Sequence, residues 1–113
     1  MSGLCGWFRG ERAGFVDPRA IASMAAPLNR FDGSTVHSVS TDFGAVAASG
    51  GNASAFQDDA RLVAVWGHAR FADADLAALA RQQGAARALA QGYARKGSGV
   101  LAGLEGAFAF AIL

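Results

Sequence analysis

The side chains that could carry out chemistry are few in this sequence, and they lie far apart. A single cysteine, Cys5, excludes an intramolecular disulfide, and the two histidines, His37 and His68, lack the Cys/His spacing of a zinc site. Asp58 and Asp59 form an acidic pair, but no third carboxylate is placed to complete a metal site. We therefore expect no metal site, a buried hydrophobic role for Cys5 and a solvated acidic pair.

A glycine-rich segment, residues 49–54 (SGGNAS), follows a predicted strand. Backbone N–H groups of such a segment can bind phosphate where a helix begins directly after it. No strong helical pattern follows here, so residues 49–59 are expected to be a surface loop. His68 and Arg70, which follow Gly67, either line a pocket or lie on the surface at the end of a strand.

Composition and charge exclude several classes of protein. The 113 residues fit one domain, and a net charge of +1 gives no electrostatic reason to bind nucleic acid or an anionic membrane. With 52% hydrophobic and 17% charged residues, the chain does not have the composition of a disordered protein. No apolar run could span a membrane and the start lacks the pattern of a signal peptide, so we expect a cytoplasmic protein. The 27 alanines and 15 glycines predict a core built largely from small residues.

Hydrophobic patterning predicts short strands and helices that would position these residues. Strands are expected at residues 4–9, 35–40, 43–48, 61–66 and 107–113. A first helix is expected to begin at Asp17-Pro18 and to be shortened or kinked by Pro27, and two helical runs follow within 73–95. Residues 96–99 predict a loop, and 101–106 a further helical turn. This order favours an α+β fold with antiparallel strands over a parallel doubly wound sheet.

Motifs at the two ends of the chain resemble those of one enzyme family. Residues 1–8 (MSGLCGWF) are similar to the start of the class II glutamine amidotransferase domains of the asparagine synthase family, which open Met-Cys-Gly-Ile/Leu-x-Gly before a hydrophobic strand. Residues 101–111 (LAGLEGAFAFA) are similar to that family's Leu-x-Gly-x-Phe-Ala-Phe-Ala segment. Residues 62–67 (LVAVWG) stand where the family has a strand ending in Asn-Gly, so the resemblance covers nearly the whole chain in order.

The resemblance implies an N-terminal-nucleophile (Ntn) hydrolase sandwich, in which two antiparallel sheets lie between helical layers (αββα). In this family the initiator Met is removed and the next side chain attacks the amide of glutamine, with the new α-amine as base. Ammonia leaves and a thioester remains. By this resemblance Ser2 occupies the nucleophile position, and Trp66 and Gly67 occupy the oxyanion-hole position of the substrate site.

The sequence departs from the family pattern at the groups that do this chemistry. Ser2 replaces the cysteine, and Trp66 replaces the asparagine of the oxyanion hole. An alternative register would align Cys5-Gly6 with the family's Cys-Gly pair. This register requires cleavage of the chain after Leu4. Residues 43–49 hold no arginine for the substrate carboxylate, and 84–95 begin without an acidic residue for its amine. The resemblance therefore implies a scaffold whose glutaminase activity is weak or lost.

The expected function is that of the N-terminal glutaminase-like domain of an asparagine synthase (glutamine-hydrolysing)-type, ATP-dependent amide-forming enzyme. ATP and Mg²⁺ would belong to a synthetase domain that this chain lacks. A glutamine-like small molecule and that synthetase domain or chain are the expected partners. Residues 49–54 also resemble the Ser-Gly-Gly-x-Asp-Ser loop of ATP pyrophosphatases, with Ala53 in place of the Asp.

Two alternatives to this function remain open. One is a non-catalytic supporting domain, as in lasso-peptide cyclases and β-lactam synthetases. The other is an inactive stand-alone fragment that acts only as an interaction module. The apolar, β-prone ending of the chain, residues 106–113 (GAFAFAIL), predicts an incomplete domain with an exposed strand edge. We therefore expect the isolated chain to be marginally stable or to self-associate as a homo-oligomer.

Overall fold

The computed structural model describes residues 3–8, 19–29, 35–50 and 52–113. Its strands are β1 (Gly3–Phe8), β2 (Val36–Thr41), β3 (Gly44–Ser49), β4 (Ser54–Gln57), β5 (Leu62–Gly67), β6 (Arg70–Phe71), β7 (Leu104–Glu105) and β8 (Phe108–Ile112). Its helices are α1 (Ala20–Ala25), α2 (Ala74–Gln83) and α3 (Ala85–Lys96), with 3₁₀ helices η1 (Ala26–Asn29) and η2 (Gly97–Gly103). The nucleophile position Ser2 and the expected helix start at Asp17-Pro18 lie outside the described residues.

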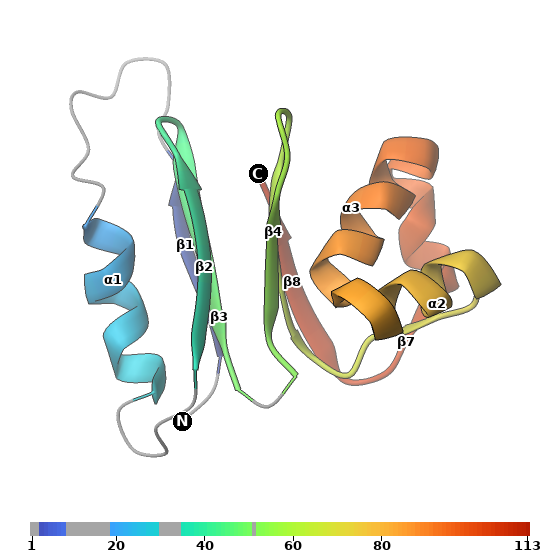
Figure 1. Cartoon of the computed structure of the whole chain (residues 1–113), viewed down its shortest axis with the longest axis horizontal. Coiled ribbons are helices and arrows are strands. Elements are labelled where there is room, and N and C mark those ends of the chain that lie inside the picture. Colours follow the sequence, from blue (N-terminus) through green and yellow to red (C-terminus); the bar gives the residue numbers. More distant parts are fainter. Residues whose placement is uncertain (1–2, 9–18, 30–34, 51) are drawn as a thin grey trace.

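Six of these strands form two antiparallel sheets that stack face to face (Figure 1). One sheet has the strand order β1-β3-β2 and the other β4-β5-β8. Helix α1 covers the outer face of the first sheet, and α2 with α3 covers the outer face of the second. The layers therefore run helix, sheet, sheet, helix, and the expected α+β class with antiparallel strands is confirmed.

The strands alternate their side chains between two different cores, because successive residues of a strand point to opposite faces. On β3, Val46 and Ala48 lie between the sheets, and Ala45 and Ala47 pack against α1. On β5, Leu62 and Ala64 lie between the sheets, and Val63 and Val65 pack beneath α2 and α3. A strand buried on both faces reads as a continuous apolar run, which explains the sequences of β3 and β5.

The helices contribute few large side chains to these cores. Ile21 and Ala25 of α1 are buried, and the 3₁₀ helix that begins at Ala26 takes over before Pro27, as expected from the missing N–H of proline. Met24 of the same helix is 39% exposed. Leu76 of α2 and Leu89 of α3 are the large buried residues of the other helical layer.

Two expectations from the sequence are wrong and need correction. Residues 54–57 are not loop but strand β4, which pairs with β5 from Ser54↔Val65 to Gln57↔Leu62. The helical turn expected at 101–106 is confirmed as far as Gly103, but its helix, η2, already begins at Gly97, where a loop was expected, and β7 follows it and pairs with β6. Strand β4 is short and forms a hairpin with β5, the next strand along the chain. Strand β7 has two residues and gains its hydrogen bonds from the distant β6, so local patterning gives little signal for it.

The strand β8 matches the expected strand at 107–113 and lies at an edge of its sheet. Its pairing with β5 continues to Leu113, which exchanges two backbone hydrogen bonds with Leu62 at 2.9 and 3.0 Å. Within the described part of the chain, no helix is long and apolar enough to cross a membrane.

Candidate functional site

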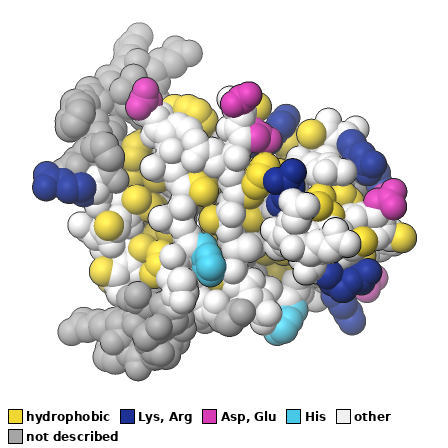
Figure 2. Space-filling view, viewed as in Figure 1, with side chains coloured by type: hydrophobic (Ala, Val, Ile, Leu, Met, Phe, Trp, Pro, Cys, Tyr) yellow, Lys and Arg dark blue, Asp and Glu magenta, His cyan; other side chains and the backbone are white. Residues whose placement is uncertain are grey.

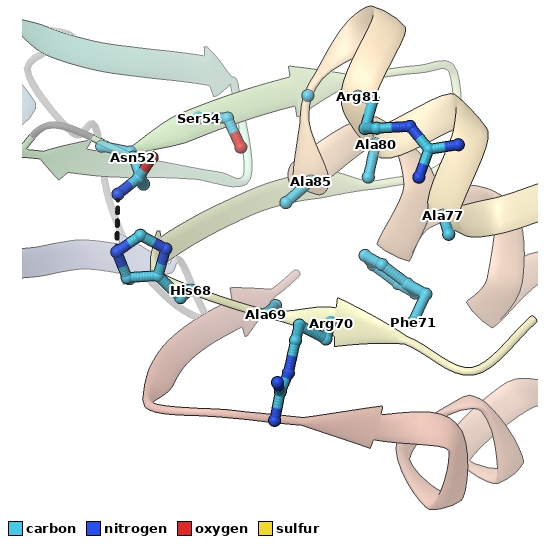
Figure 3. A pocket seen from close by; sticks show the side chains of 13 residues that line it. Asn52, Ser54, His68, Ala69, Arg70, Phe71, Ala77, Ala80, Arg81 and Ala85 are labelled. Carbon is cyan, nitrogen blue, oxygen red and sulfur yellow. Dashed lines mark hydrogen bonds between the residues drawn. The ribbon is translucent and has the colours of Figure 1, made fainter.

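A cavity of about 560 Å³ lies at one end of the second sheet, between the sheet and the turn that joins α2 to α3 (Figure 3). The segment before β4, the end of β5, strand β6 and the helical turn all contribute to it. Its lining residues are Asn52, Ala53, Ser54, Gly67, His68, Ala69, Arg70, Phe71, Ala77, Ala80, Arg81, Gly84 and Ala85.

The floor of the cavity depends on a close approach of backbone at the end of β5. Gly67 has φ +91°, and a Cβ added there would lie 2.5 Å from the carbonyl oxygen of Ala107. The amide of His68 then donates to that same oxygen at 2.9 Å. Gly106 has φ +117°, and a Cβ added there would clash with the carbonyl oxygen of His68. Only glycine fits such positions without strain, so these two residues set the path of the chain from β5 to β6.

The helical wall is fixed by two caps of different origin. Asp73 caps α2 locally, because its Oδ1 accepts from the amide of Leu76 at 3.1 Å. Helix α3 follows Gly84, which has φ +96° and no side chain to cap it. Its cap comes instead from Ser54 of β4, whose Oγ accepts from the amide of Ala86 at 2.9 Å. This hydrogen bond fastens the start of α3 to the sheet.

Polar side chains face one another across part of the cavity. Asn52 and His68 form a hydrogen bond of 3.0 Å between Nδ2 and Nε2. Because an amide nitrogen can only donate, Nε2 accepts in this arrangement, and Nδ1 is the ring nitrogen left to interact with a ligand. Figure 3 shows that second ring nitrogen on the side of His68 that faces the cavity.

The charges around the cavity are basic. Arg70 points away from it toward β7, where its guanidinium lies 3.8 Å from the carboxylate of Glu105 (Figure 3). Arg81 lies on the opposite side from His68, near Ala77, and forms no ion pair with any described residue. No aspartate or glutamate is among the lining residues.

The structure separates the two residues expected at the oxyanion position. Trp66 packs into the core between the sheets, whereas Gly67 lines the cavity on the helical side. The separation follows from the alternation of side chains along β5. His68 and Arg70, which the sequence placed either at a pocket or on the surface, are both exposed and both line this cavity.

A buried hydroxyl lies where β1 begins. Gly3, the residue after Ser2, pairs with Ser49 at the end of β3. Ser49 is 0% exposed, and its Oγ has no hydrogen-bond partner among the described residues. A buried hydroxyl without a partner costs about 1–3 kcal/mol, so it marks a position with unused hydrogen-bonding capacity. The Nε1 of Trp7 is the other such atom in the described part of the chain.

Cys5 lies inside β1 and packs against the core beneath α1. Burial raises the pKa of its thiol above the usual value, because the charged thiolate is poorly solvated there. A raised pKa lowers the fraction of thiolate at neutral pH, which disfavours a nucleophilic role and fits the expected role as a small hydrophobic residue.

The acidic pair Asp58-Asp59 is exposed, and Asp58 has a local structural role. Its Oδ1 accepts from the amides of Ala60 and Arg61, both at 2.8 Å, in the turn between β4 and β5. Among the described residues, no group of three or more His, Cys, Asp or Glu is placed to hold a metal ion.

Three polar residues of the cavity were missed by the sequence interpretation. Asn52 and Ser54 belong to a segment expected to be a surface loop, and Arg81 lies in a predicted helical run with no site assigned to it. For Asn52 and Ser54, the polar residues next to the paired glycines in segment 49–54 were the only indication of a site in the sequence. Nothing in the local sequence indicates that Arg81 borders a cavity.

Comparison of the chain with protein-family models, with curated proteins and with solved structures finds no match.

Proposed function

We propose that this chain is a glutaminase-like domain of the asparagine synthase type, whose own glutaminase activity is weak or lost. The observation that supports it best is the layer order, with two stacked antiparallel sheets between helices. This is the arrangement expected of an Ntn-hydrolase sandwich. The strand β1 begins at Gly3, so a processed Ser2 would directly precede a sheet strand, as such a nucleophile must.

The loss of hydrolysis is supported by the surroundings of that strand. Trp66 takes part in the core between the sheets and offers no amide group to an oxyanion. Removing one oxyanion donor costs about 2.7–4 kcal/mol of transition-state stabilisation in well-studied enzymes. The serine hydroxyl is also far less acidic than a cysteine thiol. The two changes together explain why the scaffold would hydrolyse glutamine poorly.

The test measures the release of ammonia from glutamine by the purified protein. Mass spectrometry first verifies that Met1 has been removed. We expect the wild type to be within about tenfold of Ser2→Ala, because the hydroxyl contributes little. We expect Ser2→Cys combined with Trp66→Asn to release ammonia faster than Ser2→Cys alone, by roughly 10²-fold, since the asparagine supplies the missing donor. A folded double variant no faster than Ser2→Ala would show that these positions are not the nucleophile and oxyanion positions.

A second candidate is a supporting domain without hydrolysis, as in cyclase-type or β-lactam-synthetase-type relatives. The first turn of α3, where the resemblance places an acidic partner for the amine of glutamine, has no acidic residue, which favours this candidate. The downstream reading frame tests this candidate. A Ser-Gly-Gly-x-Asp-Ser loop encoded there, with no ammonia release from the whole protein, would support it. An immediate stop codon would support the interaction module instead.

A further inference from the structure

We propose that the cavity beside Gly67, His68 and Arg81 binds a small organic anion, a carboxylate or phosphate carried on an apolar body. This inference does not depend on Ser2 or on glutamine hydrolysis. It rests on the size of the cavity, its charge and the mixed chemistry of its walls.

The cavity is large for a chain of 113 residues. At about 560 Å³ it lies within the usual range of small-molecule sites, about 300–1,000 Å³. Alanines keep it open, and they come from different elements. The alanines in the lining are Ala53, Ala69, Ala77, Ala80 and Ala85. A leucine at any of these positions would occupy space that is now empty.

The charge of the walls selects an anion. Arg81 has no acidic partner among the described residues, and the other lining cation, Arg70, is engaged by Glu105 at 3.8 Å. On the face drawn in Figure 2, basic and acidic side chains are interspersed over the half of the molecule that holds α2 and α3, so the preference for an anion rests on the lining residues themselves. A cation would find no carboxylate in the lining to bind it.

Neutral donors complete the polar side of the cavity. Nδ1 of His68 faces the cavity, while its Nε2 is held by Asn52 at 3.0 Å. Ser54 accepts from the amide of Ala86 through Oγ, which leaves the hydroxyl proton free to donate to a ligand. Donors on one side and a guanidinium on the other can hold the oxygens of a carboxylate or a phosphate between them.

The remaining wall is apolar and favours an organic body over a bare ion. The ring of Phe71 reaches toward the middle of the cavity, between the side chains of Arg81 and Arg70 (Figure 3). With the alanines it gives a surface that a phenyl or alkyl group would cover, removing apolar area from water. We therefore expect benzoate and phenyl phosphate to bind better than inorganic phosphate.

The test is a titration of the full chain, isotopically labelled, followed by the amide resonances of Gly67, His68 and Gly84. Benzoate and phenyl phosphate should shift them saturably at roughly millimolar concentration, and benzylamine, with a similar body and the opposite charge, should not. If both anions bind, the site accepts carboxylates and phosphates alike. If only one binds, the site is specific for that head group. No saturable shift with any anion, or equal binding of benzylamine, would overturn the proposal.

Variants separate the site from general charge effects. Arg81→Gln should weaken binding of benzoate by about tenfold or more, and Arg95→Gln, the same change at the exposed end of α3, by less than about twofold. Ala80→Leu should abolish binding by filling the cavity, with the exposed Ala94→Leu as its control. Equal effects of Arg81→Gln and Arg95→Gln would also contradict the proposal. Ser2→Ala should leave binding unchanged, so this result and the glutaminase result can fail independently.

Discussion

Gly67 is a single residue on which both the end of β5 and the floor of the cavity depend. It combines a positive φ of +91° with a contact that leaves no room for a Cβ, because the carbonyl oxygen of Ala107 would lie 2.5 Å away. Gly97 shares the positive φ, at +57°, but an added Cβ there meets nothing within 4 Å. The two glycines therefore separate the cost of backbone conformation from the cost of a steric clash.

Gly97→Ala should lower the free energy of unfolding by about 1–3 kcal/mol, the cost of a positive-φ backbone outside the αL region (φ 57°, ψ −142°) for a residue with a Cβ. Gly67→Ala should lower it by about 3 kcal/mol or more, because the clash with Ala107 adds to the strained backbone. Urea unfolding of the two variants measures both values. Equal losses would mean that the chain between β5 and β6 moves aside and that the close contact is not a constraint.

The first turn of a helix has backbone amides that need an acceptor. In α2 this acceptor comes from the residue before the helix, and in α3 it comes from a distant strand. Asp73 lies one residue before α2 and caps it from the same chain segment. Ser54 caps α3 from a strand 32 residues away. The first cap is visible in the sequence as an aspartate before a helical pattern, whereas the second exists only when the strand and the helix are packed together.

The cap of α2 makes a pH-dependent contribution to stability. The hydrogen bond from the Leu76 amide is the main cause of a lowered pKa for Asp73, and desolvation opposes it. The Asp75 amide and the nearby charges of Lys96 and Arg95 lower the pKa further. Because the folded pKa lies below the unfolded value of about 3.9, the contribution is present above that value and is lost as pH falls through the folded pKa.

Asp73→Asn keeps an oxygen acceptor and removes the charge, so it should isolate this contribution. We expect the variant to melt at a lower temperature than the wild type at about pH 7, and the two melting temperatures to converge at about pH 2. Asp59→Asn, at an exposed residue of the β4–β5 turn, is the control and should not show this convergence. A difference between Asp73→Asn and wild type that stays constant with pH would assign the effect to packing and not to charge.

The whole molecule is held together where its two sheets meet, and at that interface alanines lie among larger Leu, Val and Trp side chains. Ala48 and Ala64 are 0% exposed and face each other's sheet beside Val46 and Leu62. Small residues allow the two backbones to approach closely. Protein interiors are close-packed, so a larger side chain at a buried position is tolerated poorly.

Ala64→Leu should therefore lower the free energy of unfolding by about 1–3 kcal/mol, because the larger side chain forces the sheets apart. Ala94→Leu, on the exposed side of α3, makes the same chemical change and should alter stability by less than about 0.5 kcal/mol. Thermal or urea unfolding checks both. A neutral Ala64→Leu would mean that the space between the sheets is loosely packed.

Elements with a clear local pattern could be predicted from the sequence alone. The apolar run at Leu62–Gly67, the aspartate before α2 and the paired strands β2 and β3 were predicted within one or two residues, because side-chain periodicity and capping are local properties. The α+β class follows from their order. The turn between β2 and β3 lies at Asp42 and Phe43, one residue later than expected.

The cap that Ser54 provides for α3, the β6–β7 pair and the cavity depend on tertiary packing. Ser54 becomes strand and cap at once because β5 lies on one side of it and α3 begins on another. His68 meets Asn52 from 16 residues away, and Arg81 borders the same space from α2. Each of these depends on hydrogen bonds and contacts between segments distant in sequence. Such contacts form only when the sheets and helices pack, so no local pattern encodes them.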